Sequence, residues 1–438
     1  MAALKPYASN PFYWEWDGKP VILLGSSSED NLFQVEHFAS ELRRLARSGG
    51  NYVRCTMSSR DRDNVWPFSK LDSGLYDLTR PGEEYWRRFR EFLAECRANR
   101  IVAQIEVWDR FDFAREPWSA NPFNPKNNVN YDAAESGLRE AIESHPGACE
   151  NDFFHTVPAL RNNEVVLEHQ RRFVNWLLEV TREYDSVLYC MDNETNDDPE
   201  WGWYWANYIA ERAQEAGTVV HQTEMWDAHD LTSAEHRNTI DHPELFSFLD
   251  ISQNNHRPAD RHWENAVRMR EIVAASDTIR PLNSVKIYGS NDGRYGSRRD
   301  AEERFWRNIF AGLASSRFHR PPAGIGASPL SLRHVMSMRM FAEVYPFYAG
   351  APAREVLLNN SWNEAYCNAT DDGRFAVFFT DGGHVQLAVS EGARYSLKWL
   401  EIDACRWHPV RHEHETNGEI HLITPTDAGY WAVVVEPV

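Results

Sequence analysis

Short apolar runs alternate along most of the chain with stretches in which apolar residues recur every three or four positions. The runs lie at Val21–Leu24, Tyr52–Met57, Ile101–Val107, Val187–Met191, Thr218–Gln222, Phe248–Ser252 and Leu282–Ile287. Between the second and third runs, an apolar stripe is formed by Tyr85, Trp86, Phe89, Phe92, Leu93 and Cys96. Such runs are typical of buried strands, and such stripes are typical of the helices that cover them. The chain is therefore expected to fold as repeated strand-then-helix units.

These units number eight when a weaker one is counted at the Pro- and Gly-rich stretch Pro321–Pro329. Eight such units predict an α/β fold of the (β/α)8 TIM-barrel type. The alternative is an open, doubly wound parallel sheet. We favour the barrel because no Gly-x-Gly-x-x-Gly motif opens the first helix.

The pattern changes after about residue 352, where short alternating segments are separated by Gly, Asp and Asn. They lie at Phe375–Phe379, Val385–Val389, Tyr395–Leu400, Ile420–Ile423 and Trp431–Val435. Segments of this kind predict a small antiparallel β domain. At the other end, Phe12–Trp16 followed by Asp17-Gly18 predicts a hairpin before the barrel. We therefore expect a barrel domain at 1–351 and a sandwich-like β domain at 352–438.

Charge and composition exclude several classes of function. The net charge of -19 repels phosphate backbones, which argues against nucleic-acid binding. The apolar runs are too short to span a bilayer, so no membrane partner is expected. The six cysteines show no Cys-x-x-Cys pair, and the histidines show no His-x-His or His-Glu-x-x-His spacing, so no metal or other cofactor is predicted. The oligomeric state stays open.

The N-terminal segment has no long apolar stretch of the kind that marks a signal peptide. A cytoplasmic location is the expectation, with a periplasmic or secreted one if a signal has been removed.

Barrels of this type place their active sites at the carboxyl ends of the strands. That rule selects a short set of residues from the sequence. The candidates at the predicted strand ends are Arg54, Glu106, Trp108, Asn193, Glu194, Glu224, Trp226, His256, Lys286, Tyr288 and Asp292.

The densest group follows the fourth run, in VLYCMDNETNDDPEWGWYW. An apolar strand leads here into Asn193 and Glu194 and then into an acidic, Trp-rich helix start. An aromatic environment disfavours the charged form of a carboxyl group, so its pKa rises and it can donate a proton. Glu194 is therefore the predicted general acid. The later acids Asp197, Asp198 and Glu200 are interpreted as helix N-terminal charges.

At this point the sequence resembles the retaining glycoside hydrolases of clan A, whose fourth strand ends in Asn-Glu. The opening FYWEWDGKPVILLGSS resembles the first strand of cellulase-like members, and FLDIS followed by His256 is similar to their sixth. The C-terminal β domain resembles the accessory sandwich of that group. The resemblance implies that Glu194 is the general acid/base and that Asn193 contacts the sugar 2-hydroxyl.

One departure from the clan concerns the seventh strand, where its members carry a nucleophilic Glu. The sequence RPLNSVKIYG contains none, and Val285 or Lys286 stands at the expected position. An inverting enzyme would need a base instead, with carboxyl groups ~6.5–9.5 Å apart rather than ~5–5.5 Å. The second carboxylate is expected from Asp292 or Glu224, or else from Glu106 or Asp109.

Basic and aromatic residues complete the set of candidates. Arg54, Lys286 and other cations near the strand ends either pair with the protein's own carboxylates or bind a substrate that carries uronate or sulfate. Trp108 and Trp226 are expected to stack on sugar rings.

The sequence thus predicts a glycosidase that acts on an oligosaccharide or polysaccharide chain end. Two alternatives stay open. One is a polysaccharide lyase on acidic sugars, with Lys286, Tyr288 or His256 abstracting the proton, and the other is a non-catalytic sugar-binding barrel.

Overall fold

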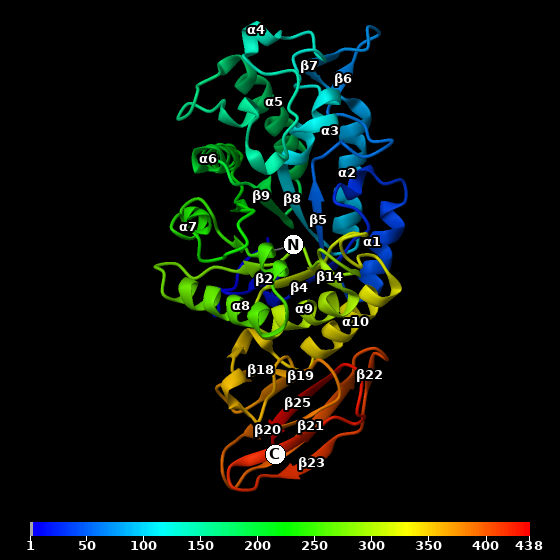
Figure 1. Ribbon diagram of the computed structural model, residues 1–438, viewed down its shortest axis with the longest axis vertical. Helices are drawn as coiled ribbons and strands as arrows, with labels where there is room; N and C mark the ends of the chain where they lie inside the picture. The colour runs from blue at the N-terminus through cyan, green and yellow to red at the C-terminus, as the bar shows by residue number, and fades with distance from the viewer. Residues whose placement is uncertain (1–2) are drawn as a thin grey trace. The chain divides into compact units, whose positions relative to one another are not determined.

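A computed structural model describes residues 3–438 and contains two compact units (Figure 1). The first contains Glu29–Leu42 and Val53–Asp250, and the second contains Leu4–Ser28, Arg43–Tyr52 and Ile251–Val438. Each unit combines parallel strands with helices, and the second also contains the C-terminal antiparallel strands.

The first unit is built on neighbouring strands in the order β10–β9–β8–β5. Their bounds are Tyr52–Thr56 for β5, Val102–Asp109 for β8, Val187–Asn193 for β9 and His221–Thr223 for β10. The pairs β8–β9 and β9–β10 are parallel. Every residue of β5, β8 and β9 is buried, which is why these strands appear in the sequence as continuous apolar runs.

Helices and a hairpin accompany these strands. Their bounds are Phe38–Arg47 for α1, Phe68–Lys70 for β6, Tyr76–Pro81 for β7, Glu83–Ala98 for α2, Glu164–Thr181 for α5, Pro199–Glu215 for α6, Ala234–Ile240 for α7 and Leu249–Asp250 for β11. Helices α2 and α5 contact one another, as do α5 and α6. The predicted strand-then-helix order is confirmed here.

The long connection between β8 and α5 contains short helices instead of regular strands. These are η2 (Arg110–Phe113), α3 (Arg115–Ala120), α4 (Ala133–Ser136), η3 (Pro146–Ala148) and η4 (Asp152–His155). Asparagine side chains hold the segment together: Asn124 donates to the carbonyls of Trp118 and Glu140, and Asn151 donates to Phe113. This bonding explains why a segment rich in Asn is ordered despite its few apolar runs.

The second unit begins with a small antiparallel sheet of β1 (Lys5–Pro6), β2 (Trp14–Trp16) and β3 (Lys19–Val21). Asp17 and Gly18 join β2 to β3 with φ angles of 52° and 74°. Two positive φ values in a two-residue loop define the turn type that suits a hairpin, so the predicted N-terminal hairpin is confirmed.

Parallel strands and three long helices follow in this unit. The bounds are Leu23–Ser26 for β4, Leu282–Asn283 for β12, Ser315–Phe318 for β15, Ala259–Ala274 for α8, Arg298–Phe310 for α9 and Pro329–Ala342 for α10. Strand β4 is paired in parallel with β15, and Gly25 of β4 is paired with Tyr52.

Strand β15 corrects the sequence prediction, which placed the eighth unit at Pro321–Pro329. Its sequence Ser-Ser-Arg-Phe is mostly polar, yet all four residues are buried. Ser315 accepts a hydrogen bond from the Ser284 N–H at 2.9 Å, and Arg317 donates to the Val285 carbonyl at 2.6 Å. Polar groups satisfied inside the protein leave no apolar signal in the sequence.

The C-terminal strands form two antiparallel sheets. The larger contains β16 (Gly350–Pro352), β18 (Ala365–Thr370), β19 (Phe375–Phe379), β25 (Trp431–Pro437), β21 (Arg394–Glu401), β22 (Arg406–Trp407) and β23 (Arg411–His414). The smaller contains β17 (Leu357–Leu358), β20 (His384–Ala388) and β24 (Glu419–Ile423). The short hairpin of β13 (Asn291–Gly293) and β14 (Gly296–Ser297) precedes α9.

Side chains from both C-terminal sheets share one core, which includes Phe379, Trp399 and Leu387. Helix α9 lies against β18 and β19, and the Trp306 ring stacks on Phe378 with 5.4 Å between centroids. This arrangement confirms a trailing antiparallel β region, seen in orange and red in Figure 1. The domain boundary at 352 stays a prediction.

Candidate active site

The carboxyl ends of parallel strands in the first unit carry the residues predicted to do acid–base chemistry. Glu106 belongs to β8, Asn193 is the last residue of β9, and Glu194 and Glu224 directly follow β9 and β10. Because parallel strands end at a common edge, these residues lie on the edge where (β/α) proteins place their active sites.

Among the described residues, Glu194 is more exposed than the other acids on this edge. It is half-buried, whereas Glu106, Asp109, Asp192 and Glu224 are at most 3% exposed. Its backbone has a φ of 62°, in the left-handed region that costs a residue other than glycine ~1–3 kcal/mol. Strain of this kind concentrates at functional sites.

Two backbone hydrogen bonds join Thr195, the residue after Glu194, to the segment after β10. The Thr195 N–H donates to the Met225 carbonyl at 3.0 Å, and the Asp227 N–H donates to the Thr195 carbonyl at 2.9 Å. These bonds join the chain just after Glu194 to the segment after β10 as a parallel bridge between Thr195 and Trp226.

Asn193 is oriented by a carboxylate. Its Nδ2 donates to Asp109 Oδ1 at 3.0 Å, and the other oxygen of Asp109 is bound closely by Arg60. This bond fixes which way the amide points, as a group that positions a sugar hydroxyl requires.

Asp112 is a buried acid that sequence reasoning missed. It accepts hydrogen bonds from Ser58 Oγ at 2.5 Å and from the Ser59 N–H at 2.8 Å, and Arg60 lies 3.3 Å away. Burial and the nearby charge of Asp109 raise the pKa of Asp112 to about 7. The available signal was an Asp shortly after the β8 end, in VWDRFD.

Arg54 is fully buried between two carboxylates. It contacts Asp30 closely and lies 2.5 Å from Glu106 Oε1. Burial alone would lower the pKa of its guanidinium, but the two carboxylates raise it well above the usual value. The sequence predicts that the basic residues either pair with the protein's own carboxylates or bind an acidic substrate. Arg54 does the former, with Asp30 and Glu106 as its partners.

Arg110 forms a second buried network behind β9. It lies 3.4 Å from Asp192 and 2.9 Å from Asp197, and Asp197 also accepts from His155 Nε2 at 3.0 Å. Burial opposes the ionisation of Asp197, but His155 and Arg110 overcome it and lower its pKa to about 2. Asp197 is therefore an ion-pair partner, whereas Asp198 caps α6 as expected.

Glu224 is enclosed. It is 2% exposed, and its Oε1 accepts hydrogen bonds from the N–H groups of Asp192 and Met225, both at 2.9 Å. Its Oε2 lies where a Cβ on Gly202 would come within 2.5 Å. Burial first, and then the charge of Asp192, raise the pKa of Glu224 well above its usual value. An enclosed carboxyl group with a raised pKa does not suit a nucleophile or a base.

The two tryptophans expected to stack on sugars are packed inside the protein. Trp108 is 2% exposed, with Phe173 and Trp205 centroids 5.1 and 5.2 Å away. Trp226 is buried, and its indole N–H donates to Thr239 Oγ1 at 2.8 Å. Both rings pack in the protein core, which corrects the prediction that they stack on sugar rings.

In the second unit, the Tyr288 ring contacts two histidine rings. The centroids of His256 and His319 are 5.7 and 4.8 Å from that of Tyr288. Lys286 is only 2% exposed, and Asp292 is exposed in the β13–β14 hairpin with a φ of 58°. The roles predicted for these residues in the site stay predictions.

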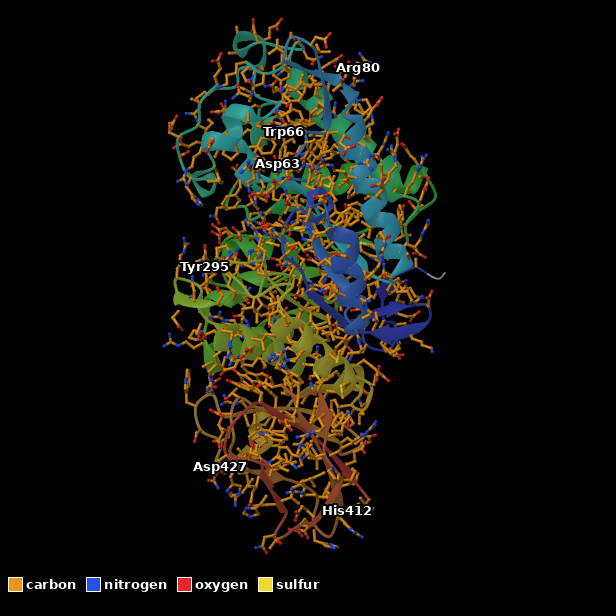
Figure 2. All side chains as sticks on the ribbon, turned by 90° about the vertical axis from the view of Figure 1, so that its right-hand side faces the viewer. Asp63, Trp66, Arg80, Tyr295, His412 and Asp427 are labelled. Atoms are coloured by element: carbon orange, nitrogen blue, oxygen red, sulfur yellow. The ribbon has the colours of Figure 1, made fainter. Side chains whose placement is uncertain are left out.

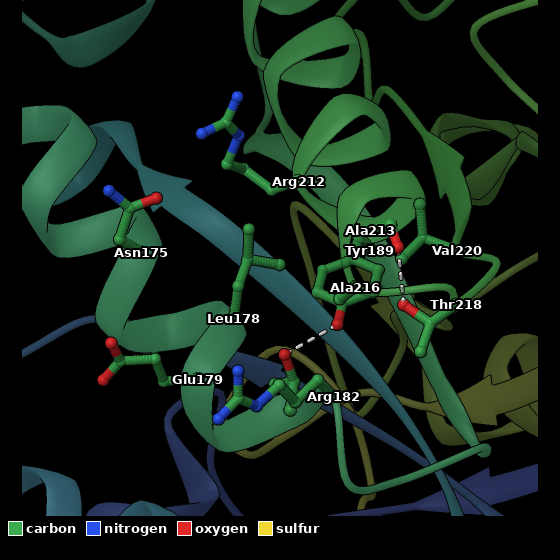
Figure 3. A pocket seen from close by; sticks show the side chains of 11 residues that line it. Asn175, Leu178, Glu179, Arg182, Tyr189, Arg212, Ala213, Ala216, Thr218 and Val220 are labelled. Carbon is green, nitrogen blue, oxygen red and sulfur yellow. Dashed lines mark hydrogen bonds between the residues drawn. The ribbon is translucent and has the colours of Figure 1, made fainter.

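A hollow of about 280 Å³ lies beside the opposite end of β9 (Figure 3). Leu178 of α5, Tyr189 of β9 and Ala213 of α6 line it. Tyr189 lies near the start of β9, so this hollow is remote from the edge that carries Glu194.

Within residues 3–438, no group of three or more His, Cys, Asp or Glu side chains could hold a metal ion. Across the same residues, every helix is too short or too polar to cross a membrane.

No protein-family model matches the sequence, and no curated relative matches it either. Solved structures share its fold. A glycoside hydrolase family 5 protein from Bacteroides vulgatus is similar over 99% of this chain and 92% of its own, with a TM-score of 0.64 and 13% identity. An α-amylase from H. orenii is similar over 95% and 98%, with a TM-score of 0.58 and 12% identity.

An endo-1,4-beta-mannanase from Rhizomucor miehei is similar over 78% of this chain and 99% of its own, with a TM-score of 0.52 and 12% identity. The expected resemblance to clan A is thus confirmed at the level of the fold. The chain has the fold of family 5 glycoside hydrolases.

Proposed function

We propose that this protein hydrolyses glycosidic bonds and that Glu194 is its general acid. The observation that carries the proposal is the state of Glu194: it ends a parallel strand, is half-buried, and has a left-handed backbone. A fold shared with glycoside hydrolases supports the same class of reaction. The proposal includes closure of the parallel strands into the (β/α)8 barrel that the sequence predicts.

In this proposal Glu194 protonates the leaving oxygen while Asn193 binds a hydroxyl of the sugar. Asp109 and Arg60 hold Asn193 in place for that contact. General acid catalysis by one group contributes ~100- to 10,000-fold to the rate. Asp112, which Arg60 also contacts, acts through this network and not on the substrate.

The second carboxylate is proposed to be Asp292, since Glu224 is enclosed and burial raises its pKa. Asp292 is exposed and lies after the segment RPLNSVKIYG, which has no Glu. With no strand-seven nucleophile, we infer an inverting reaction in which Asp292 activates water. The substrate is proposed to be a chain end, because a long segment after a strand of such a fold tends to close a cleft into a pocket, and the segment between β8 and α5 is long.

The test measures hydrolysis by the Glu194→Gln variant on a panel of unactivated oligosaccharides. A loss of at least about 100-fold is expected, because Gln keeps the shape but donates no titrating proton. Glu200→Gln, in the first turn of α6, is the matched control and should keep full activity. Near-normal turnover by Glu194→Gln would overturn the role. NMR of the first-formed anomer tests inversion.

A lyase is the second candidate, and the placement of Tyr288 favours it. A phenol whose ring contacts two imidazoles is a suitable group to abstract a proton next to a uronate carboxylate. Elimination would give an unsaturated product that absorbs in the ultraviolet. Such a product from oligouronates, lost in Tyr288→Phe and kept in Glu194→Gln, would select the lyase over the hydrolase.

A further inference from the structure

The loop after β5 forms a second hollow in the first unit, on the hairpin of β6 and β7. Its volume is about 590 Å³. Aromatic and basic side chains line it together, among them Trp66, Lys70, Tyr76 and Arg80. Trp66 and Arg80 are labelled in Figure 2, where both belong to the upper part of the molecule.

The backbone under Trp66 is fixed at both neighbouring residues. The Val65 carbonyl accepts from Gln34 Nε2 at 2.8 Å and from Ser59 Oγ at 2.7 Å. The Pro67 carbonyl accepts from Trp86 Nε1 at 2.9 Å and from the Gly82 N–H at 2.8 Å. A ring held on such a backbone is a preorganised platform, which lowers the entropic cost of binding.

Gly82 allows this close approach. A Cβ at position 82 would lie 2.6 Å from the Trp66 carbonyl oxygen and 2.9 Å from that of Phe68. Phe68 anchors the strand below, with its ring 5.1 Å from Phe123 and 5.9 Å from Trp176. The hairpin is therefore built on the core of the first unit and not attached loosely to it.

Two polar groups that line this hollow are not used by the protein. Throughout the described chain, nothing bonds the Trp66 indole N–H or the Tyr76 hydroxyl, although both side chains are half-buried. Lys70 is paired across the hairpin with Tyr76, and its Nζ lies 5.5 Å from that ring. Arg80 is exposed, and its charge helps to lower the pKa of Asp77.

The hollow of Figure 3 differs in this respect. There, Arg212 is paired with Glu215 at 2.7 Å and Asn175 accepts from Tyr208 at 3.0 Å. In the β6–β7 hollow, Glu84 is held at 2.8 Å by both Arg87 and Arg88. Lys70 and Arg80 therefore line the hollow beside a carboxylate that other arginines already pair, on a chain whose net charge is -19.

We propose that this hollow binds an acidic sugar residue of an oligosaccharide. Trp66 offers a flat ring and an N–H donor, as sugar C–H faces and hydroxyls require. Lys70 and Arg80 offer the positive charge that a carboxylate or sulfate requires. The choice of a sugar rests on the proposed glycosidase function, whereas the preference for an anion rests on this hollow alone.

The experiment is calorimetric titration of the full-length Glu194→Gln protein, which binds without turnover. The probes are oligogalacturonate, a sulfated carrageenan oligosaccharide and a neutral cello-oligosaccharide of equal length. We expect at least one acidic probe to bind about tenfold more tightly than the neutral one, with an affinity that falls as salt rises. Comparison of the two acidic probes identifies carboxylate or sulfate as the preferred group.

Trp66→Ala should weaken binding of the acidic probe about tenfold. Lys70→Gln and Arg80→Gln should each weaken the acidic probe severalfold and leave the neutral one unchanged. The matched controls are Trp362→Ala, another exposed Trp, and Lys19→Gln, another exposed Lys. Lys70 and Arg80 are surface residues, so Lys70→Gln and Arg80→Gln still test binding of the acidic probe if Trp66→Ala does not fold.

Equal binding of acidic and neutral probes, or full binding by Lys70→Gln and Arg80→Gln, would overturn the proposal. Failure here is distinct from failure of the catalytic proposal. Lost turnover in Glu194→Gln without selective binding would refute the hollow alone. Selective binding with turnover intact in Glu194→Gln would refute the catalytic role alone.

Discussion

Two adjacent strands of the first unit end in a glutamate, and the two glutamates have opposite surroundings. Glu194 follows β9 and is half-buried, whereas Glu224 follows β10 and is 2% exposed. The contacts around Glu224 explain the difference. Its Oε1 accepts hydrogen bonds from the N–H groups of Asp192 and Met225, and the Gly202 backbone lies close to its Oε2. A position after a strand therefore does not by itself make an acid catalytic.

The largest expected effect concerns Glu194, the more exposed of the two glutamates. Glu194→Gln should reduce hydrolysis of a substrate with a poor leaving group by ~100- to 10,000-fold, because the proton donor is lost. Steady-state kinetics measure it, with Glu200→Gln as the reference. A highly activated leaving group should recover most of the rate, since it needs little protonation. A uniform loss on both substrates would indicate damage to the fold.

Gly202→Ala tests how tightly Glu224 is enclosed. The added Cβ would come within 2.5 Å of Glu224 Oε2, so we expect a loss of ~1–3 kcal/mol in the free energy of unfolding. Urea denaturation measures it. The same change in a Glu224→Ala background should cost less, because the opposing oxygen is gone. Equal costs in both backgrounds would mean that the two residues do not press on one another.

Asp112 is a third acid to compare with these two, and its protonation should make the stability of the protein depend on pH. Its pKa is about 7 in the folded protein, raised by burial and by Asp109, against ~3.9 in the unfolded chain. Between those values the folded state keeps a proton that the unfolded state releases. Stability should therefore fall as pH rises from about 4 to 7, by up to ~1.4 kcal/mol per unit.

Asp112→Asn should flatten that slope. Urea denaturation at a series of pH values measures it, and Asp63→Asn, which changes an exposed acid in the loop after β5, is the control. Asp192, whose pKa burial raises to about 6, contributes a similar slope that remains in the variant. An unchanged slope in Asp112→Asn would show that Asp112 is ionised in the folded protein.

The smallest effect is expected from Glu224→Gln. Gln has the same shape, and its oxygen can still accept the N–H bonds of Asp192 and Met225. Because the acid is enclosed and burial raises its pKa, activity should change less than about tenfold. Kinetics on the unactivated substrate check this. A loss as large as that of Glu194→Gln would restore Glu224 to the catalytic pair.

The strands and helices were predictable where the hydrophobic pattern was strong. Buried strands such as β5 and β9 need apolar residues on both faces, and amphipathic helices such as α2 need an apolar stripe. Strand β15 was not predictable, since its buried polar residues are satisfied by partners distant in sequence. The hairpin β2–β3 was predictable from Asp17-Gly18 alone, because its turn needs positive φ at both residues.

For the site, the sequence by itself determined which chemical groups stand at the strand ends, because strand ends follow from local pattern. The tertiary structure alone decided what each group is able to do. Backbone N–H groups and Gly202 enclosed Glu224, ion pairing engaged Arg54 and Arg110, and packing enclosed Trp108. Burial and pairing depend on partners far away in the chain, and these partners set whether an acid is charged, a cation available or a ring exposed.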